Sequence, residues 1–137
     1  MSTDANKRLV QRFVDEIFVK GRPEAIDELV APDFVSETFA IAADGPTKLK
    51  AAAQRVHASL TDVRFEIGDV VAEDDRVAVR LTASATATGD FMGIPAAGKG
   101  YRIGEMHFFR IRDGKVVEHW HQYDGAGMMK QLGAAPG

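Results

Sequence analysis

Apolar residues in the first third of the chain recur at the spacing of amphipathic helices. Between residues 9 and 18 they return every three or four positions, Asp4 is a suitable N-cap, and Gly21 follows the last apolar position. A proline opens a second short helix over about residues 23–30, and Pro32 ends it. This part of the chain therefore predicts two consecutive helices.

A short strand over residues 34–39 and a third helix are predicted next. The third helix begins at Pro46, and its apolar positions lie on one face. The residues expected to be buried on that face are Leu49, Ala52, Ala53, Val56 and Leu60.

After Asp62 the apolar period changes from that of a helix to that of a strand. Alternating strands are predicted from residue 63, over 77–88, over 101–112 and over 115–123, and a short helix over 125–132. Helices first and a meander of long antiparallel strands afterwards define the α+β class. A twisted sheet with its helices on one face curls into a cone, so we expect one domain of this shape.

The side chains on one face of the strand over residues 77–87 become smaller along its length. Its side chains run from valine and leucine to Ala83, Ala85 and Ala87. Small side chains leave space on the concave side of the sheet, unless a helix packs against the alanines. A ligand pocket and a filled core are both compatible with this pattern.

Composition narrows the functional classes. The chain has 137 residues, 45% of them hydrophobic and 27% charged, which is typical of one globular domain. A net charge of −3 with scattered basic residues argues against nucleic acid as a partner, and no apolar run approaches the roughly 20 residues of a membrane helix. The absence of cysteine excludes disulfides and thiolate chemistry. Because the N-terminus lacks a secretory hydrophobic segment, we expect a soluble, cytoplasmic protein.

Most of the candidate chemistry lies on the last hairpin, and the turn at residues 112–115 decides which side chains share a face. A two-residue loop places His107 beside Trp120 and puts His121 on the opposite face. A three-residue loop with a bulge at Gly114 instead pairs His107 with His119. We favour the bulged loop, because it gathers a coherent row on one face: Glu105, His107, His119, His121 and Tyr123.

This row supports two chemical hypotheses. Three histidines form a workable set of metal ligands, and histidines in a partly dry pocket suit general acid–base catalysis. We prefer the second, because nothing else in the chain supplies a clear further metal ligand, and we expect neither a metal nor another cofactor. The plain alternative is that the row is solvent-exposed, or that each histidine only bonds a nearby carbonyl. His57, on the third helix, is expected at the surface.

Four segments resemble the SnoaL-like polyketide cyclases, and together they span nearly the whole chain. They are LVAPDFV at residues 29–35, GIPAAGK at 93–99, FRIRDGKVVEHW at 109–120 and QLG at 131–133. The resemblance implies the NTF2-like fold, a conical α+β barrel that commonly dimerises through the outer surface of its sheet. Here that surface would present Met106, Phe108, Trp120 and Val116.

The resemblance also implies a reaction. Members of this family are cofactor-free cyclases that close a ring of an aromatic polyketide ester by an intramolecular aldol reaction. In these enzymes an acidic residue on the last strand is the acid–base catalyst, and a histidine on the preceding strand lies near it. His107 matches that histidine, but His121 occupies the position of the usual acid. Either His121 takes over proton transfer, or Asp124 does, or cyclase activity is absent.

The mechanism that we expect is proton abstraction by His121 from a carbon between two carbonyls, with His107 donating to the developing alkoxide. The substrate would be a small hydrophobic carbonyl compound. A non-catalytic binding protein and an isomerase or hydrolase that uses Asp124 or Glu105 are the competing hypotheses. Besides Glu105 and His119, the expected pocket wall consists of Phe13, Phe34, Tyr101 and Phe109.

Overall fold

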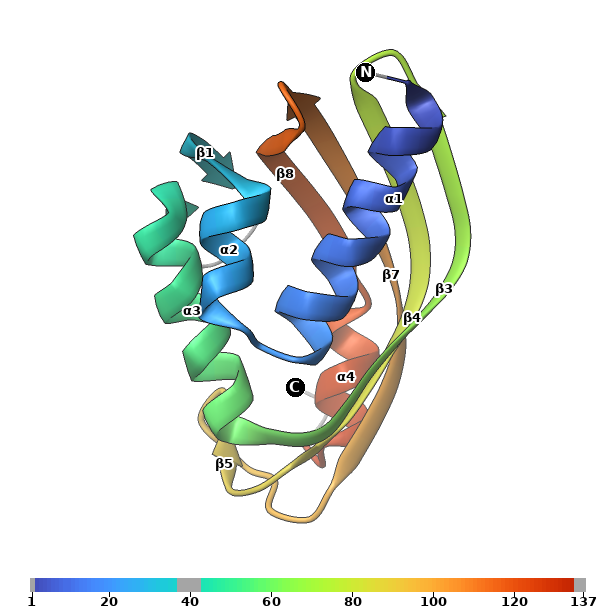
Figure 1. Cartoon of the computed structure of the whole chain (residues 1–137). Coiled ribbons are helices and arrows are strands. Elements are labelled where there is room, and N and C mark those ends of the chain that lie inside the picture. The colour runs from blue at the N-terminus through green and yellow to red at the C-terminus, as the bar shows by residue number, and fades with distance from the viewer. Residues whose placement is uncertain (1, 37–42, 135–137) are drawn as a thin grey trace.

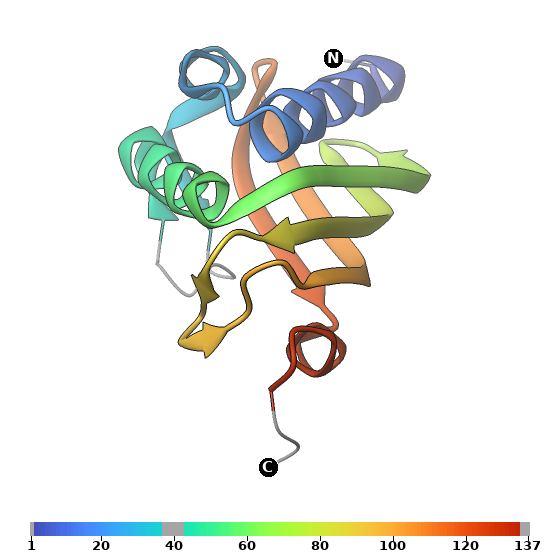
Figure 2. The same ribbon diagram turned by 90° about the horizontal axis from the view of Figure 1, so that it is seen from below.

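A curved sheet with helices on its concave side forms the structure, a computed structural model that describes residues 2–36 and 43–134 (Figures 1 and 2). The helices are α1 (Thr3–Phe13), the π-helix η1 (Val14–Val19), α2 (Pro23–Leu29), α3 (Gly45–Ser59) and α4 (Gly125–Gln131). The strands are β1 (Val30–Ser36), β2 (Ala43–Asp44), β3 (Leu60–Glu73), β4 (Arg76–Ala87), β5 (Asp90–Phe91), β6 (Ile94–Pro95), β7 (Gly100–Arg112) and β8 (Lys115–Tyr123).

The sheet has six strands in the order β2-β1-β8-β7-β4-β3. Only the pair of β1 and β8 is parallel, and the short strands β5 and β6 form a separate hairpin. In Figure 1, α1, α2 and α3 lie in front of the sheet, and α4 follows β8 near its lower end. The predicted α+β class and the order of helices and strands are confirmed. No helix in the described part of the chain is long and apolar enough to cross a membrane.

The first helix differs from its prediction at both ends. Ser2 rather than Asp4 is the N-cap, and its Oγ accepts a hydrogen bond from the Ala5 N–H at 3.1 Å. After Phe13 the helix widens into η1, where the Lys20 N–H donates to the Asp15 carbonyl at 3.0 Å. A π-turn takes one more residue than an α-turn, and this changes the direction of every later side chain.

Two further boundaries were predicted incorrectly. β1 begins at Val30 and includes Pro32, whereas residues 37–39 of the predicted strand lie outside the described residues. On α3, Leu49 and Ala52 are buried as expected, but Val56 is 42% exposed. Leu60 belongs to β3 rather than to the helix. The predicted apolar face of this helix is therefore only partly buried.

The turn between β7 and β8 is the two-residue loop that we did not favour. Arg112 pairs with Lys115, and Asp113 and Gly114 have φ angles of 52° and 74°, as a type I′ turn requires. The register then shifts by one residue. Ile111 pairs with Val116 and Arg110 with Glu118, so Val117 is an extra residue on β8 with no partner on β7.

This bulge restores the row of histidines on one face, but with different partners from those predicted. Glu105 pairs with Tyr123, His107 with His121 and Phe109 with His119. The common face is thus confirmed, whereas the bulge at Gly114 and the pairing of His107 with His119 were wrong. The side chains of Val116 and Val117 are both buried, which shows why the extra residue lies inside the strand.

Alternation along β7 separates the core from the outer face of the sheet. Odd-numbered residues from Tyr101 to Ile111 are buried and even-numbered ones are exposed. Met106 and Phe108 are exposed as expected, but Val116 is fully buried in the core, so its predicted place on the outer face was wrong. The small side chains of β4, Ala83, Ala85 and Ala87, are also buried in the core.

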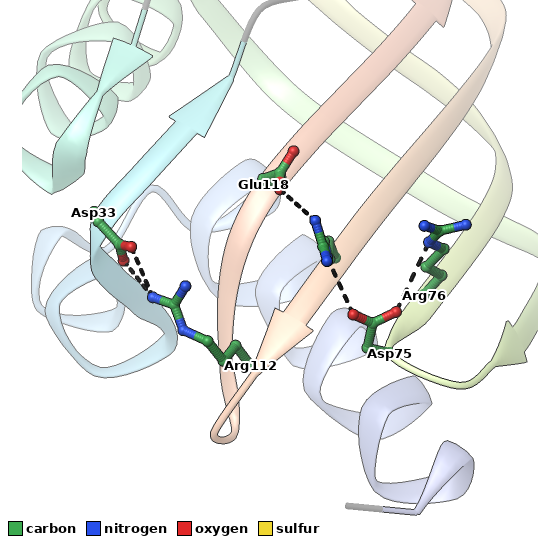
Figure 3. A network of polar contacts seen from close by, with 6 residues as sticks. Asp33, Asp75, Arg76, Arg112 and Glu118 are labelled. Atoms are coloured by element: carbon green, nitrogen blue, oxygen red, sulfur yellow. Dashed lines mark hydrogen bonds and ion pairs between the residues drawn. The ribbon is translucent and has the colours of Figure 1, made fainter.

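Ion pairs cross the outer face of the sheet (Figure 3). Arg110 joins Asp75, in the β3–β4 turn, to Glu118 on β8, at N–O distances of 3.1 and 3.0 Å. Arg112 donates to both carboxylate oxygens of Asp33 on β1. Exposed pairs of this kind contribute little stability each, but they favour one register for the strands they join.

Candidate active site

A cavity of about 470 Å³ lies between α3 and the inner faces of β3, β7 and β8. Its wall is mainly apolar, with Leu49, Leu60 and Phe65 among the lining residues. A polar patch in this wall comes from paired positions on β7 and β8. It consists of Glu105, His107, His121 and Tyr123. An apolar pocket with a few convergent polar groups is the usual form of a small-molecule site.

A chain of hydrogen bonds leads from this patch into the core. Glu105 Oε1 lies 2.7 Å from His107 Nε2, and His107 Nδ1 lies 2.9 Å from His119 Nε2. The His119 ring is held in turn by Ser36 on β1, whose Oγ lies 3.2 Å from Nδ1. All four side chains are buried. The first two face the cavity, and the other two lie behind it.

Burial keeps two of the histidines neutral. Desolvation, with a smaller effect of the neighbouring His107, lowers the pKa of His121 to about 4. The pKa of His119 is well below its ordinary value for the same leading reason, with His107 and His121 adding to the effect. Desolvation also raises the pKa of Tyr101 to about 12, so this phenol keeps its proton. Near pH 7 His119 and His121 are therefore neutral imidazoles rather than imidazolium ions.

The π-helix brings an aromatic side chain against the patch. Phe18 lies with its ring centroid 5.3 Å from that of His107, and equally far from that of Phe65. His57 Nε2–H donates to the Phe18 carbonyl at 3.0 Å, so α3 is tied to η1 at the wall of the cavity. His57 is thus half-buried and lines the cavity, contrary to the prediction that it lies at the surface.

Of the pocket residues predicted from sequence, Glu105 and Tyr101 line the cavity, as do the catalytic candidates His107 and His121. The remaining expected wall residues are fully buried and pack behind it: His119, Phe13, Phe34 and Phe109.

Asp124 is exposed and caps α4, where its Oδ1 accepts from the Gly127 N–H at 2.9 Å. The structure does not bring it to the cavity. Glu105 is the only acidic side chain in the cavity wall among residues 2–36 and 45–134.

Several lining residues were not predicted. They include Phe18, Phe65, Met92 and the residues that α3 contributes, whereas Tyr123 belongs to the row predicted on the hairpin. Phe18 and Phe65 carried the signal of an apolar helix face and an alternating strand, but such a signal does not distinguish a cavity wall from a core. The position of Phe18 depends on the π-turn, for which we found no signal in the sequence.

Three histidines meet closely enough to be considered as metal ligands. One ring nitrogen from each of His107, His119 and His121 lies within 4.8 Å of the others. However, the facing nitrogens of His107 and His119 are hydrogen-bonded to each other at 2.9 Å. A metal ion would have to replace that hydrogen bond, so the present geometry favours a hydrogen-bonded chain over a ligand set.

Comparison with known proteins identifies the family and the fold. The sequence profile of the SnoaL-like polyketide cyclases matches residues 8–132. IdmH of Streptomyces antibioticus, a proposed polyketide cyclase, is 30% identical, with a TM-score of 0.79 over 93% of this chain and 98% of its own.

Two other solved structures extend this comparison. AclR of Streptomyces galilaeus, a proposed hydroxylase, is 27% identical, with a TM-score of 0.85 over 98% of this chain and 100% of its own. A Catenulispora acidiphila protein with a ketosteroid isomerase-like fold, solved in complex with trimethylamine, is 18% identical. It superposes with a TM-score of 0.76 over 93% of this chain and 93% of its own. No curated protein sequence matches the chain.

Proposed function

This chain belongs to the SnoaL-like polyketide cyclase family, and from that premise we propose that it is a cofactor-independent cyclase-type enzyme. Its substrate is a small hydrophobic carbonyl compound, and its reaction is an intramolecular aldol ring closure. One observation carries the proposal: the Glu105–His107 pair and the neutral His121 lie together in the wall of an otherwise apolar cavity.

Glu105 is the base in this proposal. Both ring nitrogens of His107 take part in hydrogen bonds within the protein, Nε2 with Glu105 and Nδ1 with His119. Glu105 uses Oε1 for that contact, and its second oxygen, Oε2, is the atom assigned to the substrate. A C–H proton between two carbonyls is already acidic, so a positioned carboxylate suffices as base. The proton passes to Oε2, and the C–H electron pair becomes the enolate.

His121 is the electrophilic partner. A neutral imidazole still carries one N–H, and His121 donates it to the enolate oxygen. A histidine with a lowered pKa can polarise a carbonyl in the same way. This assignment differs from the roles that the sequence suggested, in which His121 was the base and His107 the donor. Burial supports the change, because a histidine whose pKa is about 4 is a weak proton acceptor.

The apolar wall folds the substrate for ring closure. Cavities of about 300–1,000 Å³ bury most of a small organic ligand, and the volume of about 470 Å³ lies in that range. The enolate carbon attacks a second carbonyl of the same molecule, a C–C bond forms, and that carbonyl becomes an alkoxide. Glu105 then returns its proton to the alkoxide. Holding the two reacting carbons in contact contributes to the rate alongside acid–base catalysis.

Hydrogen exchange tests the base directly. The α-protons of ethyl benzoylacetate, an aryl β-keto ester, are followed by NMR in D₂O with the wild-type protein, Glu105→Gln and Glu118→Gln. The last variant makes the same change on β8, at a residue whose ion pair lies on the outer face of the sheet. We expect the wild type and Glu118→Gln to accelerate exchange, and Glu105→Gln to lose about 10²–10⁴-fold of that acceleration.

Two results would contradict the proposal. Equal acceleration by Glu105→Gln and the wild type would remove Glu105 as the base. Binding of the ester by the wild type without any acceleration over buffer would support the competing hypothesis, a ligand-binding protein.

A further inference from the structure

His119 and Ser36 are polar, buried and outside the cavity, yet they continue the hydrogen-bond chain that begins at Glu105. Their exposed fractions are 0% and 3%. His119 Nε2 faces His107 Nδ1 at 2.9 Å, and Ser36 Oγ faces His119 Nδ1 at 3.2 Å. The proposed reaction uses neither side chain. A buried histidine in contact with the Glu105–His107 pair calls for a physical role of its own.

With Glu105 as a carboxylate and His107 as a neutral ring, the contacts fix the proton positions along the chain. A Glu105 carboxylate only accepts hydrogen bonds, so His107 Nε2, at 2.7 Å, must carry a proton. A neutral His107 then presents a bare Nδ1, which accepts from His119 Nε2–H. His119 Nδ1 in turn accepts from the Ser36 hydroxyl. Every group in the chain is satisfied when both rings carry their proton on Nε2.

The opposite tautomer of His107 removes the base. With its proton on Nδ1, the ring presents a bare Nε2 to Glu105 at 2.7 Å, and that contact is favourable only if Glu105 is a carboxylic acid. The tautomer of His107 thus decides whether the cavity contains a carboxylate or an acid. His119 faces the Nδ1 atom on which this choice depends. Burial disfavours a second proton on the His119 ring, which leaves it one donor and one acceptor.

We propose that His119, anchored by Ser36, is a positioning residue that fixes His107 as the Nε2–H tautomer and so keeps Glu105 as a carboxylate directed at the substrate. The catalytic part rests on the proposed function, whereas the tautomer itself does not. His119 does not touch the substrate. Its loss would lower the fraction of molecules with a competent base, so it would act on kcat more than on KM.

Two variants of similar volume separate hydrogen bonding from packing. His119→Gln keeps an N–H donor that reaches His107 Nδ1, whereas His119→Met fills the site without any donor. We expect His119→Met to lower kcat for ester exchange by about tenfold, the order expected for loss of one buried hydrogen bond. We expect KM to be little changed. His119→Gln should recover most of the loss. Urea unfolding of both variants verifies that they are folded.

Nitrogen-15 NMR of the imidazole rings reads the tautomers without any substrate. In the wild type at pH 7 we expect His107 and His119 both as Nε2–H, and in His119→Met a mixture of tautomers at His107. Finding His107 as Nδ1–H in the wild type, or equal rates for His119→Met and His119→Gln beside an active wild type, would overturn the inference. If the wild type shows no exchange, the proposed function fails, while the NMR result still decides the tautomer.

Discussion

His107 and His121 occupy directly paired positions on β7 and β8, and their ring centroids lie 4.9 Å apart with an angle of 11° between the ring planes. This contact couples their charges, because a proton on one ring disfavours a proton on the other. His107 is the second cause, after burial, of the lowered pKa of His121. Both rings line the cavity, but His107 belongs to the hydrogen-bond chain with Glu105, whereas burial keeps His121 neutral.

The lowered pKa of His121 predicts a loss of stability in acid. The folded value is about 4 and the ordinary value 6.5, so between these pH values the unfolded state binds more protons. The free energy of unfolding contributed by this residue is therefore fully present above about pH 6.5 and falls as the pH is lowered toward 4. Urea unfolding at intervals from pH 7.5 to 4.5 measures it. His121→Gln should show a shallower decline than the wild type, and identical slopes would contradict the assignment.

Replacing His121 should reduce the rate rather than binding. Removal of one donor that stabilises a developing oxyanion typically costs about 10²–10³-fold in kcat. We expect His121→Phe to show a loss of this order in ester exchange, with similar affinity for the ester. Because the pKa of His121 is about 4, the pH–rate profile of the wild type should have no inflection from this residue between pH 5 and 8. A rate that increases as an imidazolium forms near pH 6.5 would contradict the neutral-donor role.

Filling the cavity should abolish ligand binding without unfolding the protein. Ala53 on α3 lines the cavity, whereas Ala51 on the same helix is exposed. We expect Ala53→Trp to weaken binding of the dye ANS by at least about tenfold, equal to 1.4 kcal/mol, and Ala51→Trp to leave it unchanged. Fluorescence titration provides the measurement, and far-UV circular dichroism checks the fold. Equal effects of the two variants would place the binding site elsewhere.

The outer face of the sheet predicts a homodimer. Val71, Ala78, Phe108 and Trp120 are paired in succession across four strands, and they form an apolar row. Phe108 is 40% exposed and Val71 64%. Because an exposed apolar row is typical of a self-association surface, we expect the wild type to sediment as a dimer and Phe108→Glu as a monomer. Thr88→Glu, at an exposed position beyond β4, serves as the control. A wild-type monomer at all concentrations would contradict this expectation.

The element order and the chemical face of the hairpin could be predicted from sequence for a simple reason. The helical and strand periods of apolar residues are local, and they assign each side chain to a face without knowledge of the rest of the chain. Glu105 and His107 were assigned to one face of β7 in this way, and Pro23 placed the start of α2 correctly. His121 was grouped with them only by assuming an extra residue in the hairpin, which lies at Val117 rather than at Gly114. The location of Phe13, Phe34 and Phe109 behind the cavity rather than in its wall could not be predicted, because both places give the same apolar pattern.

Sequence alone thus determined which residues alternate and where the last hairpin turns. Tertiary structure decided which of the hairpin's histidines meet. The bulge at Val117 and the π-turn over Val14–Val19 each add one residue to a regular element, and each redirects the side chains that follow. Such an insertion weakens the local hydrogen-bond pattern, and it persists only where distant contacts outweigh that cost. Those contacts here include the burial of Val116 and Val117 and the packing of Phe18 against His107. They join residues far apart in the chain, so no local pattern could show them.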